Sequence, residues 1–223
     1  MSETVKLKAN DGHEFDAYVA RPEGKPRAGL VVVQEAFGVN HHIRSVADSY
    51  AQDGFLAIAP ALFDRYERGV QLGYDGADMQ KAMSFFPNLN MNWAVSDTAA
   101  ALGYARMQTG QKCGVIGYCF GGTVAWLAAT WLPVNAAVGY YGGQISAFSG
   151  EQPECPVMLH FGKLDRHIPK EAVDKLQAAH PEIQIFRYDA DHGFNCDERA
   201  SYSAPAASEA RARSLEFLKQ HLF

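Results

Sequence analysis

Apolar residues fall in short continuous runs that alternate with longer amphipathic segments along most of the chain. A continuous apolar run of five or six residues is typical of a strand that is buried on both faces of a parallel sheet. The pattern predicts strands at residues 29–33, 55–59, 113–116, 136–140, 157–161 and 183–188, and helices at about 43–53, 93–107, 170–180 and 206–221. This alternation indicates an α/β fold with a mostly parallel central sheet and helices on both faces.

Two stretches depart from this alternation. Residues 4–8 and 14–20 flank the turn signal Asn10-Asp11-Gly12, which predicts an antiparallel N-terminal hairpin at the edge of the sheet. Residues 60–92 are rich in aromatic residues and glycine, with a helical pattern only near 78–86. Because long insertions in such folds commonly lie over the carboxyl ends of the strands, we expect residues 60–92 to form a wall of the substrate pocket.

The composition is that of an ordinary globular protein, with 223 residues of which 48% are hydrophobic and 20% are charged. We therefore expect a single domain over residues 1–223. A formal net charge of -5, without a basic stripe, argues against a nucleic-acid partner. No apolar run approaches the length of a membrane-spanning helix and the N-terminus lacks a secretory signal, so we predict a cytoplasmic protein without a membrane partner. The four cysteines have no C-x-x-C spacing, which predicts neither a disulfide framework nor a zinc site.

A candidate nucleophile lies in the hexapeptide Gly117-Tyr118-Cys119-Phe120-Gly121-Gly122, between a predicted strand and a helix-forming segment. A Gly-x-nucleophile-x-Gly turn is sharp and strained, so larger side chains at the glycine positions would collide with the backbone. The backbone N–H of Phe120 falls at a helix N-terminus, where it can stabilise an oxyanion. The motif predicts acyl chemistry at Cys119; a tight turn with a structural thiol is the alternative.

A cysteine nucleophile needs a base, and the base needs an orienting group. Asp165 and His192 each follow a predicted strand, and the order nucleophile, acid, histidine is that of the α/β-hydrolase fold. His192 could instead be a surface loop residue, and Asp165 could simply cap the following helix. Asp189 and Asp191 compete with Asp165 for the orienting role, but they are too near His192 in sequence to come from a different strand end.

Glu35 ends an apolar strand, where a buried carboxylate is costly unless it has a partner. One interpretation is a buried ion pair with an arginine such as Arg44. The other is a carboxylate beside Cys119, whose charge would disfavour the thiolate that His192 alone would favour. The backbone N–H of Ala36 is a candidate for the second oxyanion donor beside that of Phe120.

The remaining histidines have simpler interpretations. His160 ends a predicted strand, and we predict that it is a hydrogen-bonded core residue rather than a catalytic one. His41 and His42 are adjacent, so on a helix their side chains point in different directions, and we predict no metal site there.

Five segments together resemble the dienelactone hydrolases (carboxymethylenebutenolidases), and the similarity spans nearly the whole chain. The segments are 34–40 (QEAFGVN), 117–122 (GYCFGG), 139–142 (GYYG), 162–165 (GKLD) and 191–194 (DHGF). The resemblance implies an α/β-hydrolase fold and a catalytic triad of Cys119, Asp165 and His192. It further implies that Glu35 holds the thiol neutral until substrate displaces it, and that an enol-lactone is hydrolysed through an acyl-cysteine during bacterial degradation of aromatic compounds. By the same resemblance the enzyme is a monomer that uses no cofactor.

The residues that would hold the substrate depart from the family pattern. Family members bind the substrate carboxylate with two arginines, but Cys196 occupies one of these positions and the segment around the other offers Gln80 and Lys81 but no arginine. A lysine supplies charge without the bidentate fork of arginine. Arg199 or Arg65 could replace the missing arginines. Phe37 and Tyr141, within the resembling segments, are further candidates for contact with a small lactone or ester.

Three alternative functions stay open at this point. A general carboxylesterase would use the same residues on another ester. A class I glutamine amidotransferase also has a Gly-x-Cys-x-Gly turn, but it ends in His-x-Glu, whereas Gly193 and Phe194 follow His192 here. A non-catalytic or thiol-sensing binding protein could have kept the fold without the activity.

Overall fold

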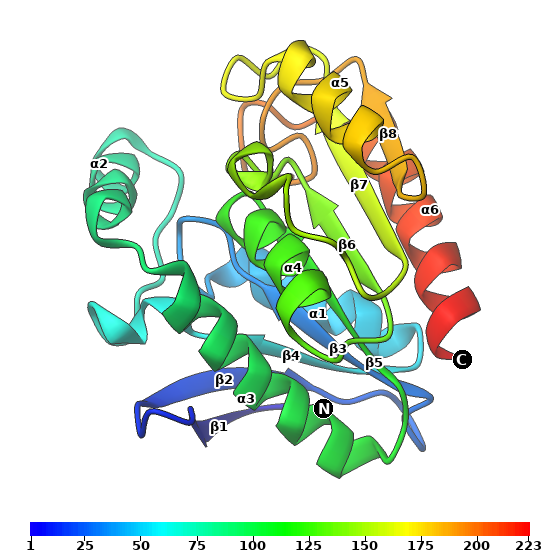
Figure 1. The fold of residues 1–223 in the computed structure, drawn as a ribbon. Helices are drawn as coiled ribbons and strands as arrows, with labels where there is room; N and C mark the ends of the chain where they lie inside the picture. The colour runs from blue at the N-terminus through cyan, green and yellow to red at the C-terminus, as the bar shows by residue number, and fades with distance from the viewer.

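The computed structural model describes all residues from 1 to 223 and contains one eight-stranded sheet (Figure 1). Its strands are β1 (Ser2–Lys8), β2 (Glu14–Ala20), β3 (Ala28–Val33), β4 (Phe55–Pro60), β5 (Cys113–Tyr118), β6 (Ala137–Tyr140), β7 (Val157–Gly162) and β8 (Gln184–Tyr188). The spatial order is β1-β2-β4-β3-β5-β6-β7-β8. β1 and β2 pair antiparallel with each other, β2 pairs antiparallel with β4, and all other pairs are parallel. The predicted parallel sheet and edge hairpin are confirmed.

Helices cover both faces of this sheet, as Figure 1 shows. They are α1 (His41–Gln52), α2 (Gly76–Phe85), α3 (Met91–Thr109), α4 (Phe120–Trp131), α5 (Lys170–Ala179) and α6 (Ala204–Leu222). α3, α4 and α5 lie on one face, α1 and α6 lie on the other, and α2 stands apart at one side. No helix is both long enough and apolar enough to cross a membrane.

Capping residues explain why α1 and α3 begin earlier than the apolar pattern predicts. The Asn40 side chain accepts a hydrogen bond from the backbone N–H of Ile43 at 3.2 Å, so α1 begins at His41. Asn90 caps α3 in the same way. All residues of β3, β4 and β5 are buried, as the continuous apolar runs require.

The segment at residues 60–92 contains α2 and packs against the loop that follows β3. The backbone N–H of Leu72 donates to the carbonyl of Phe37 at 2.9 Å, and the Asn40 side chain donates to the carbonyl of Leu72 at 2.9 Å. Gly38 has φ +79°, and a Cβ there would lie 1.9 Å from the carbonyl oxygen of Val70, so only glycine fits this contact. The segment therefore lies at the carboxyl end of β3, as predicted, and its role as a pocket wall stays a prediction.

A buried polar network lies beneath the carboxyl ends of β6 and β7. His160 is completely buried, with Nδ1 2.9 Å from the hydroxyl of Tyr188 and Nε2 2.9 Å from the hydroxyl of Ser214. The Tyr140 hydroxyl is 2.7 Å from the same serine oxygen. Burial, with a smaller effect of the Arg213 charge, lowers the pKa of His160 to about 3. The expectation of a hydrogen-bonded core histidine is confirmed.

This histidine makes a testable contribution to acid sensitivity. In the unfolded chain a histidine takes up a proton below about pH 6.5, whereas folded His160 stays neutral down to about pH 3. Because of this group, the free energy of unfolding should fall by about 1.4 kcal/mol for each unit by which the pH is lowered between these two values. Urea titrations of wild type and His160→Gln from pH 7 to pH 4 check it. Equal pH slopes for the two proteins would contradict the assignment.

Candidate active site

Cys119 occupies the turn between β5 and α4 with a strained backbone. Its φ is 54° and its ψ is -116°, a conformation that non-glycine residues rarely adopt. A Cβ on Gly117 would lie 1.9 Å from the carbonyl oxygen of Gly121, and a Cβ on Gly121 would lie 2.4 Å from that of Val33. Both glycines are therefore required for this turn, which leaves the Cys119 side chain only half-buried.

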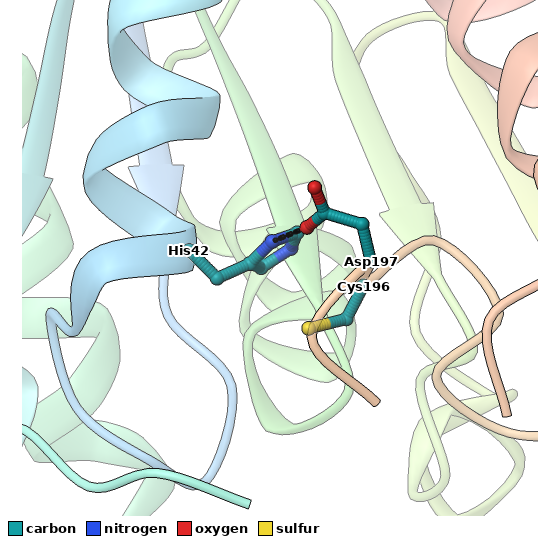
Figure 2. Close-up of side chains that lie close together, drawn as sticks. All are labelled: His42, Cys196 and Asp197. Atoms are coloured by element: carbon teal, nitrogen blue, oxygen red, sulfur yellow. Dashed lines mark hydrogen bonds and ion pairs between the residues drawn. The ribbon is translucent and has the colours of Figure 1, made fainter. Parts of the chain in front are cut away.

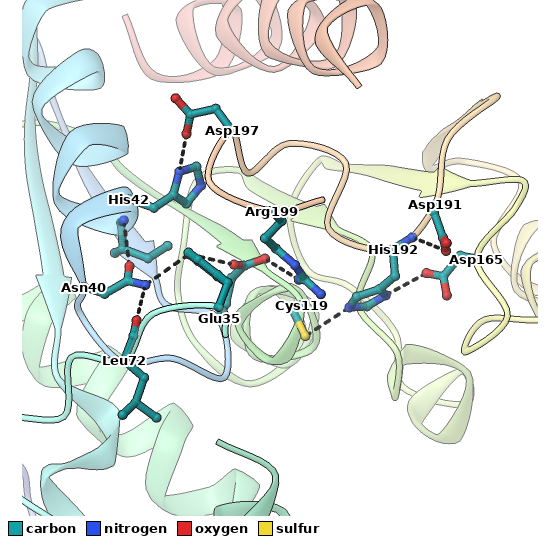
Figure 3. Close-up of polar contacts among 12 residues, drawn as sticks. Glu35, Asn40, His42, Leu72, Cys119, Asp165, Asp191, His192, Asp197 and Arg199 are labelled. Carbon is teal, nitrogen blue, oxygen red and sulfur yellow. Dashed lines mark hydrogen bonds and ion pairs between the residues drawn. The ribbon is translucent and has the colours of Figure 1, made fainter. Parts of the chain in front are cut away.

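Cys119, His192 and Asp165 form one hydrogen-bonded row across three loops at the carboxyl edge of the sheet (Figure 3). Nε2 of His192 lies 3.2 Å from Sγ of Cys119, and Nδ1 lies 2.7 Å from Oδ2 of Asp165. The Asp165 side chain is fully buried and also accepts the backbone N–H of His167 at 2.8 Å. These contacts fix both the position and the orientation of the imidazole ring.

The electrostatics of the row favour a charged imidazole. Burial opposes ionisation of both His192 and Asp165, but the hydrogen bond and charge attraction between them outweigh it. The pKa of Asp165 is lowered from its usual value, and the hydrogen bonds to Asp165 and Cys119 raise the pKa of His192 to about 10. An imidazolium next to the sulfur stabilises negative charge on that sulfur. The arrangement therefore places a charged imidazole, which is a proton donor, beside the sulfur of Cys119.

The two rival aspartates do not reach the imidazole ring. Asp191 accepts the backbone N–H of His192 at 2.6 Å, and Asp189 pairs with Lys163 at 2.9 Å on the exposed surface. Of the three candidates, the structure brings only Asp165 to Nδ1 of His192.

The two predicted oxyanion donors, the backbone N–H groups of Ala36 and Phe120, make no hydrogen bond, although both residues are almost completely buried. The backbone N–H of Gly121 donates to the carbonyl of Gln34 at 3.1 Å, which holds the loop after β3 against the start of α4. Buried amides without a partner are rare. Their role as oxyanion donors stays a prediction.

Glu35 pairs with Arg199 rather than with Cys119. Oε1 of Glu35 lies 3.5 Å from Nη1 of Arg199, and the Tyr74 hydroxyl donates to Oε2 at 3.4 Å. Glu35 makes no hydrogen bond to Cys119, and the suggested partner Arg44 instead donates to the carbonyl of Val39. The interpretation as a buried ion pair is confirmed, with Arg199 in place of Arg44, and the effect of Glu35 on the Cys119 thiol stays a prediction.

The guanidinium of Arg199 lies near two aromatic rings, those of the predicted substrate-contact residue Phe37 and of Tyr74. It is 5.6 Å from the ring centre of Phe37 and 5.9 Å from that of Tyr74. A Cβ on Gly193 would lie 2.3 Å from Nη1 of Arg199, so this glycine makes room for the guanidinium beside His192. Figure 3 shows Arg199 reaching from its loop towards Glu35 and Cys119.

Tyr141 completes the surroundings of the histidine. Its ring centre is 5.0 Å from that of His192, and its backbone has a positive φ of 37°. The Tyr141 hydroxyl is buried without a hydrogen-bond partner. Burial and the charge of Glu35 raise the pKa of this tyrosine, so the hydroxyl keeps its proton and remains available as a donor.

Two basic residues that were candidates for substrate binding, Lys81 and Arg65, lie away from the Cys119–His192–Asp165 row. Lys81 was predicted to contact substrate, but it pairs with Glu67 on an exposed face of α2. It lies there because the face of α2 that packs against the loop after β3 carries the apolar side chains of Met79 and Ala82. Arg65 binds Asp97 at 2.7 Å and Asp11 at 2.7 Å, which leaves it committed to an ion-pair network. Of the proposed substitutes for the missing arginines, only Arg199 lies beside the row.

Sequence reasoning missed Tyr74 and the surroundings of Cys196. Tyr74 comes from the irregular segment before α2, where no periodic pattern marks a residue that will reach Glu35. Cys196 is buried next to His42 and Asp197, and these three side chains have the composition of a metal-ligand set. No signal at the level of spacing could have found this group, because His42 lies more than 150 residues before Cys196 and Asp197 in the chain.

Comparison with known proteins identifies the family of this chain. Residues 15–222 match the dienelactone hydrolase family. The chain belongs to this family. A carboxymethylenebutenolidase from Pseudomonas putida is 33% identical over 227 residues, which cover 98% of this chain and 96% of that protein. The structure of a putative dienelactone hydrolase from Klebsiella pneumoniae is 28% identical, has a TM-score of 0.84 and covers 99% of both chains.

The dienelactone hydrolase family shares its architecture with more distant esterases. An esterase from Pyrococcus furiosus has a TM-score of 0.72 at 15% identity, covers 100% of this chain and 94% of its own, and shows the fold alone. The chain thus has the α/β-hydrolase fold and is a hydrolase of ester or lactone bonds. Membership of the dienelactone hydrolase family decides against the amidotransferase and the non-catalytic alternatives.

Proposed function

We propose that this enzyme opens an enol-lactone ring, or cleaves a related small ester, through an acyl-cysteine intermediate on Cys119. The observation that carries the proposal is the row in which His192 contacts both the Cys119 sulfur, at 3.2 Å, and the buried Asp165 carboxylate, at 2.7 Å. Nucleophile, base and orienting acid with these contacts are the arrangement needed for acyl transfer.

The first half of the proposed reaction is acylation. The Cys119 thiolate attacks the lactone carbonyl carbon, and the amides of Phe120 and Ala36 stabilise the oxyanion that develops. The ring C–O bond then breaks as the imidazolium of His192 gives its proton to the leaving enol oxygen. Burial opposes ionisation of His192, but the hydrogen bonds to Asp165 and Cys119 raise its pKa to about 10, which favours the protonated ring that this step requires.

The second half is hydrolysis of the thioester. The ring of His192, now neutral, removes a proton from water, and the resulting hydroxide adds to the acyl carbon. Collapse of this intermediate expels the Cys119 thiolate and leaves the carboxylic acid product. Asp165 keeps Nδ1 protonated throughout, so Nε2 is the atom that exchanges protons in both halves.

The proposed substrate class is an acidic lactone. The name of the Pseudomonas putida relative, carboxymethylenebutenolidase, indicates a butenolide with an attached carboxylate. Lactones of this kind arise from the bacterial degradation of aromatic compounds, and we propose the same context here. Arg199 is the cation beside Cys119, and we propose that the substrate carboxylate takes the place of Glu35 on its guanidinium.

Loss of ultraviolet absorbance on ring opening of a dienelactone tests the proposed reaction. We expect turnover by wild type. Hydrolysis of neutral aryl esters without any ring opening would keep the cysteine mechanism and reassign the enzyme as a general carboxylesterase.

Replacing Arg199 tests the recognition of the carboxylate. We expect Arg199→Met to lower kcat/KM for the dienelactone by about 10- to 100-fold, because a charge-assisted hydrogen bond contributes about 1.5–3 kcal/mol. The variant leaves Glu35 buried without its partner. The double variant Arg199→Met/Glu35→Gln is therefore measured as well. Both variants are also assayed on 4-nitrophenyl acetate, a neutral substrate. Lys81→Met is the matched control and should behave as wild type. An equal loss on both substrates would contradict carboxylate binding by Arg199.

A further inference from the structure

Helix α1 begins with two histidines, and both meet acidic residues of the loop that follows β8. Nδ1 of His41 lies 2.5 Å from a carboxylate oxygen of Glu198, and Nδ1 of His42 lies 3.1 Å from one of Asp197. The His41 side chain is 85% exposed, whereas that of His42 is only 5% exposed. The two neighbouring pairs are therefore similar in chemistry and opposite in burial.

The buried histidine has a third neighbour, Cys196. One ring nitrogen of His42, the sulfur of Cys196 and one carboxylate oxygen of Asp197 lie within 4.8 Å of one another. Figure 2 shows these three side chains converging between α1 and the loop. Cys196 is a completely buried free thiol.

A second observation indicates that the group is chemically incomplete. Nε2 of His42 is buried and has no hydrogen-bond partner. A buried ring nitrogen without a partner is costly, and such groups are few in folded proteins. Asp197 is hydrogen-bonded to Nδ1, so a metal ion on Nε2 would satisfy the nitrogen that the protein leaves unpaired, and the Asp197 carboxylate would turn from Nδ1 towards the metal to become a ligand.

We propose that His42, Cys196 and Asp197 bind a divalent transition-metal ion of the zinc type. Imidazole nitrogen, thiolate sulfur and carboxylate oxygen are the donors that Zn²⁺ takes in proteins, usually with four ligands in all. Metal–ligand distances of about 2.0–2.3 Å place tetrahedral ligand atoms about 3.3–3.8 Å apart, so the donors must approach by about 1 Å. The Asp197 side chain is 69% exposed and free to rotate, and solvent on its side can supply the fourth ligand.

The charges around the group are compatible with a divalent cation. Binding replaces the thiol proton of Cys196 with a sulfur–metal bond, and the proton leaves to solvent without any redox step. The negative charges of Glu35, Asp197 and the Cys196 thiolate then balance those of Arg199 and the metal.

Metal binding at this place would fix α1 to the loop that supplies His192 and Arg199. The site is separate from the Cys119 row, and none of its three ligands has a role in the proposed reaction. We therefore expect a bound metal to stabilise the fold and to change neither the nucleophile nor the proton donor.

Competition for Zn²⁺ with a chromophoric chelator tests the site. The experiment uses Cys119→Ala as background, so that the catalytic thiol cannot bind the metal. We expect one equivalent of bound Zn²⁺, and at least a tenfold higher Kd after a further Cys196→Ala or His42→Phe substitution. Asp197→Ala should also raise the Kd, and because this side chain is exposed the substitution should leave the fold intact. His41→Gln is the matched control, because it removes the neighbouring histidine–acid pair and should leave the Kd unchanged.

Titration with Co²⁺ gives an independent spectroscopic readout. A thiolate ligand produces a sulfur-to-cobalt charge-transfer band in the near ultraviolet. We expect this band in Cys119→Ala and its absence in Cys119→Ala/Cys196→Ala. The proposal is overturned if Cys119→Ala binds no Zn²⁺, if Cys196→Ala leaves the Kd unchanged, or if His41→Gln weakens binding as much as His42→Phe.

Discussion

Cys119→Ala is expected to lower kcat/KM for lactone and ester hydrolysis by about 10⁴-fold or more. The variant removes the only sulfur that contacts His192, and no serine or second cysteine hydrogen-bonds to that ring. The oxyanion amides remain in place, so any residual rate reports what they achieve without a nucleophile. Initial rates on a dienelactone and on an aryl ester measure the loss.

Cys119→Ser separates the need for a nucleophile from the need for a thiol. A serine hydroxyl does not hold a negative charge beside an imidazolium as a thiolate does, so we expect only a small residual activity. Cys155→Ala is the matched thiol control, since Cys155 lies outside the row and should not affect turnover. Wild-type rates in Cys119→Ala would remove Cys119 from the mechanism.

Asp165→Asn is expected to lower kcat by about 10³- to 10⁴-fold with little change in the fold. An amide at this position can donate to Nδ1 of His192 and so select the wrong tautomer, and the negative charge that favours the imidazolium is lost. The rate of Cys119 alkylation by iodoacetamide should fall together with kcat, because the thiolate loses its charged partner.

Asp191→Asn is the matched control for this prediction. Asp191 lies next to His192 in sequence but contacts only its backbone N–H, at 2.6 Å. We expect kcat within about threefold of wild type, since the contact does not reach the ring. A larger loss of kcat in Asp191→Asn than in Asp165→Asn would mean that Asp191, and not Asp165, orients the imidazole.

Features encoded by short-range patterns could be predicted from the sequence. Continuous apolar runs predicted the central strands, and the glycine pattern around Cys119 predicted its strained turn. Asp165 and His192 could be placed because they follow parallel strands, whose carboxyl ends must meet at one edge of the sheet. Their hydrogen bonds then depend only on loop geometry.

Contacts between irregular segments could not be predicted in the same way. The partner of Glu35 was uncertain because several arginines were available, and only the course of the loop after β8 selects Arg199 over Arg44. Lys81 lies in the expected segment, but the rotation of α2 directs it towards Glu67. The burial of Cys196 depends equally on that loop, which has no periodic pattern.

Partitioning of the acyl group between water and methanol tests the acyl-cysteine mechanism most directly. Esters that share one acyl group and differ in leaving group are hydrolysed by wild type in the presence of a fixed methanol concentration. Every ester of the series gives the same acyl-enzyme, because the leaving group departs before water or methanol attacks. The account therefore predicts the same ratio of methyl ester to acid from every ester. A ratio that changes with the leaving group would mean that water attacks the substrate directly, and would contradict an acyl-cysteine on Cys119.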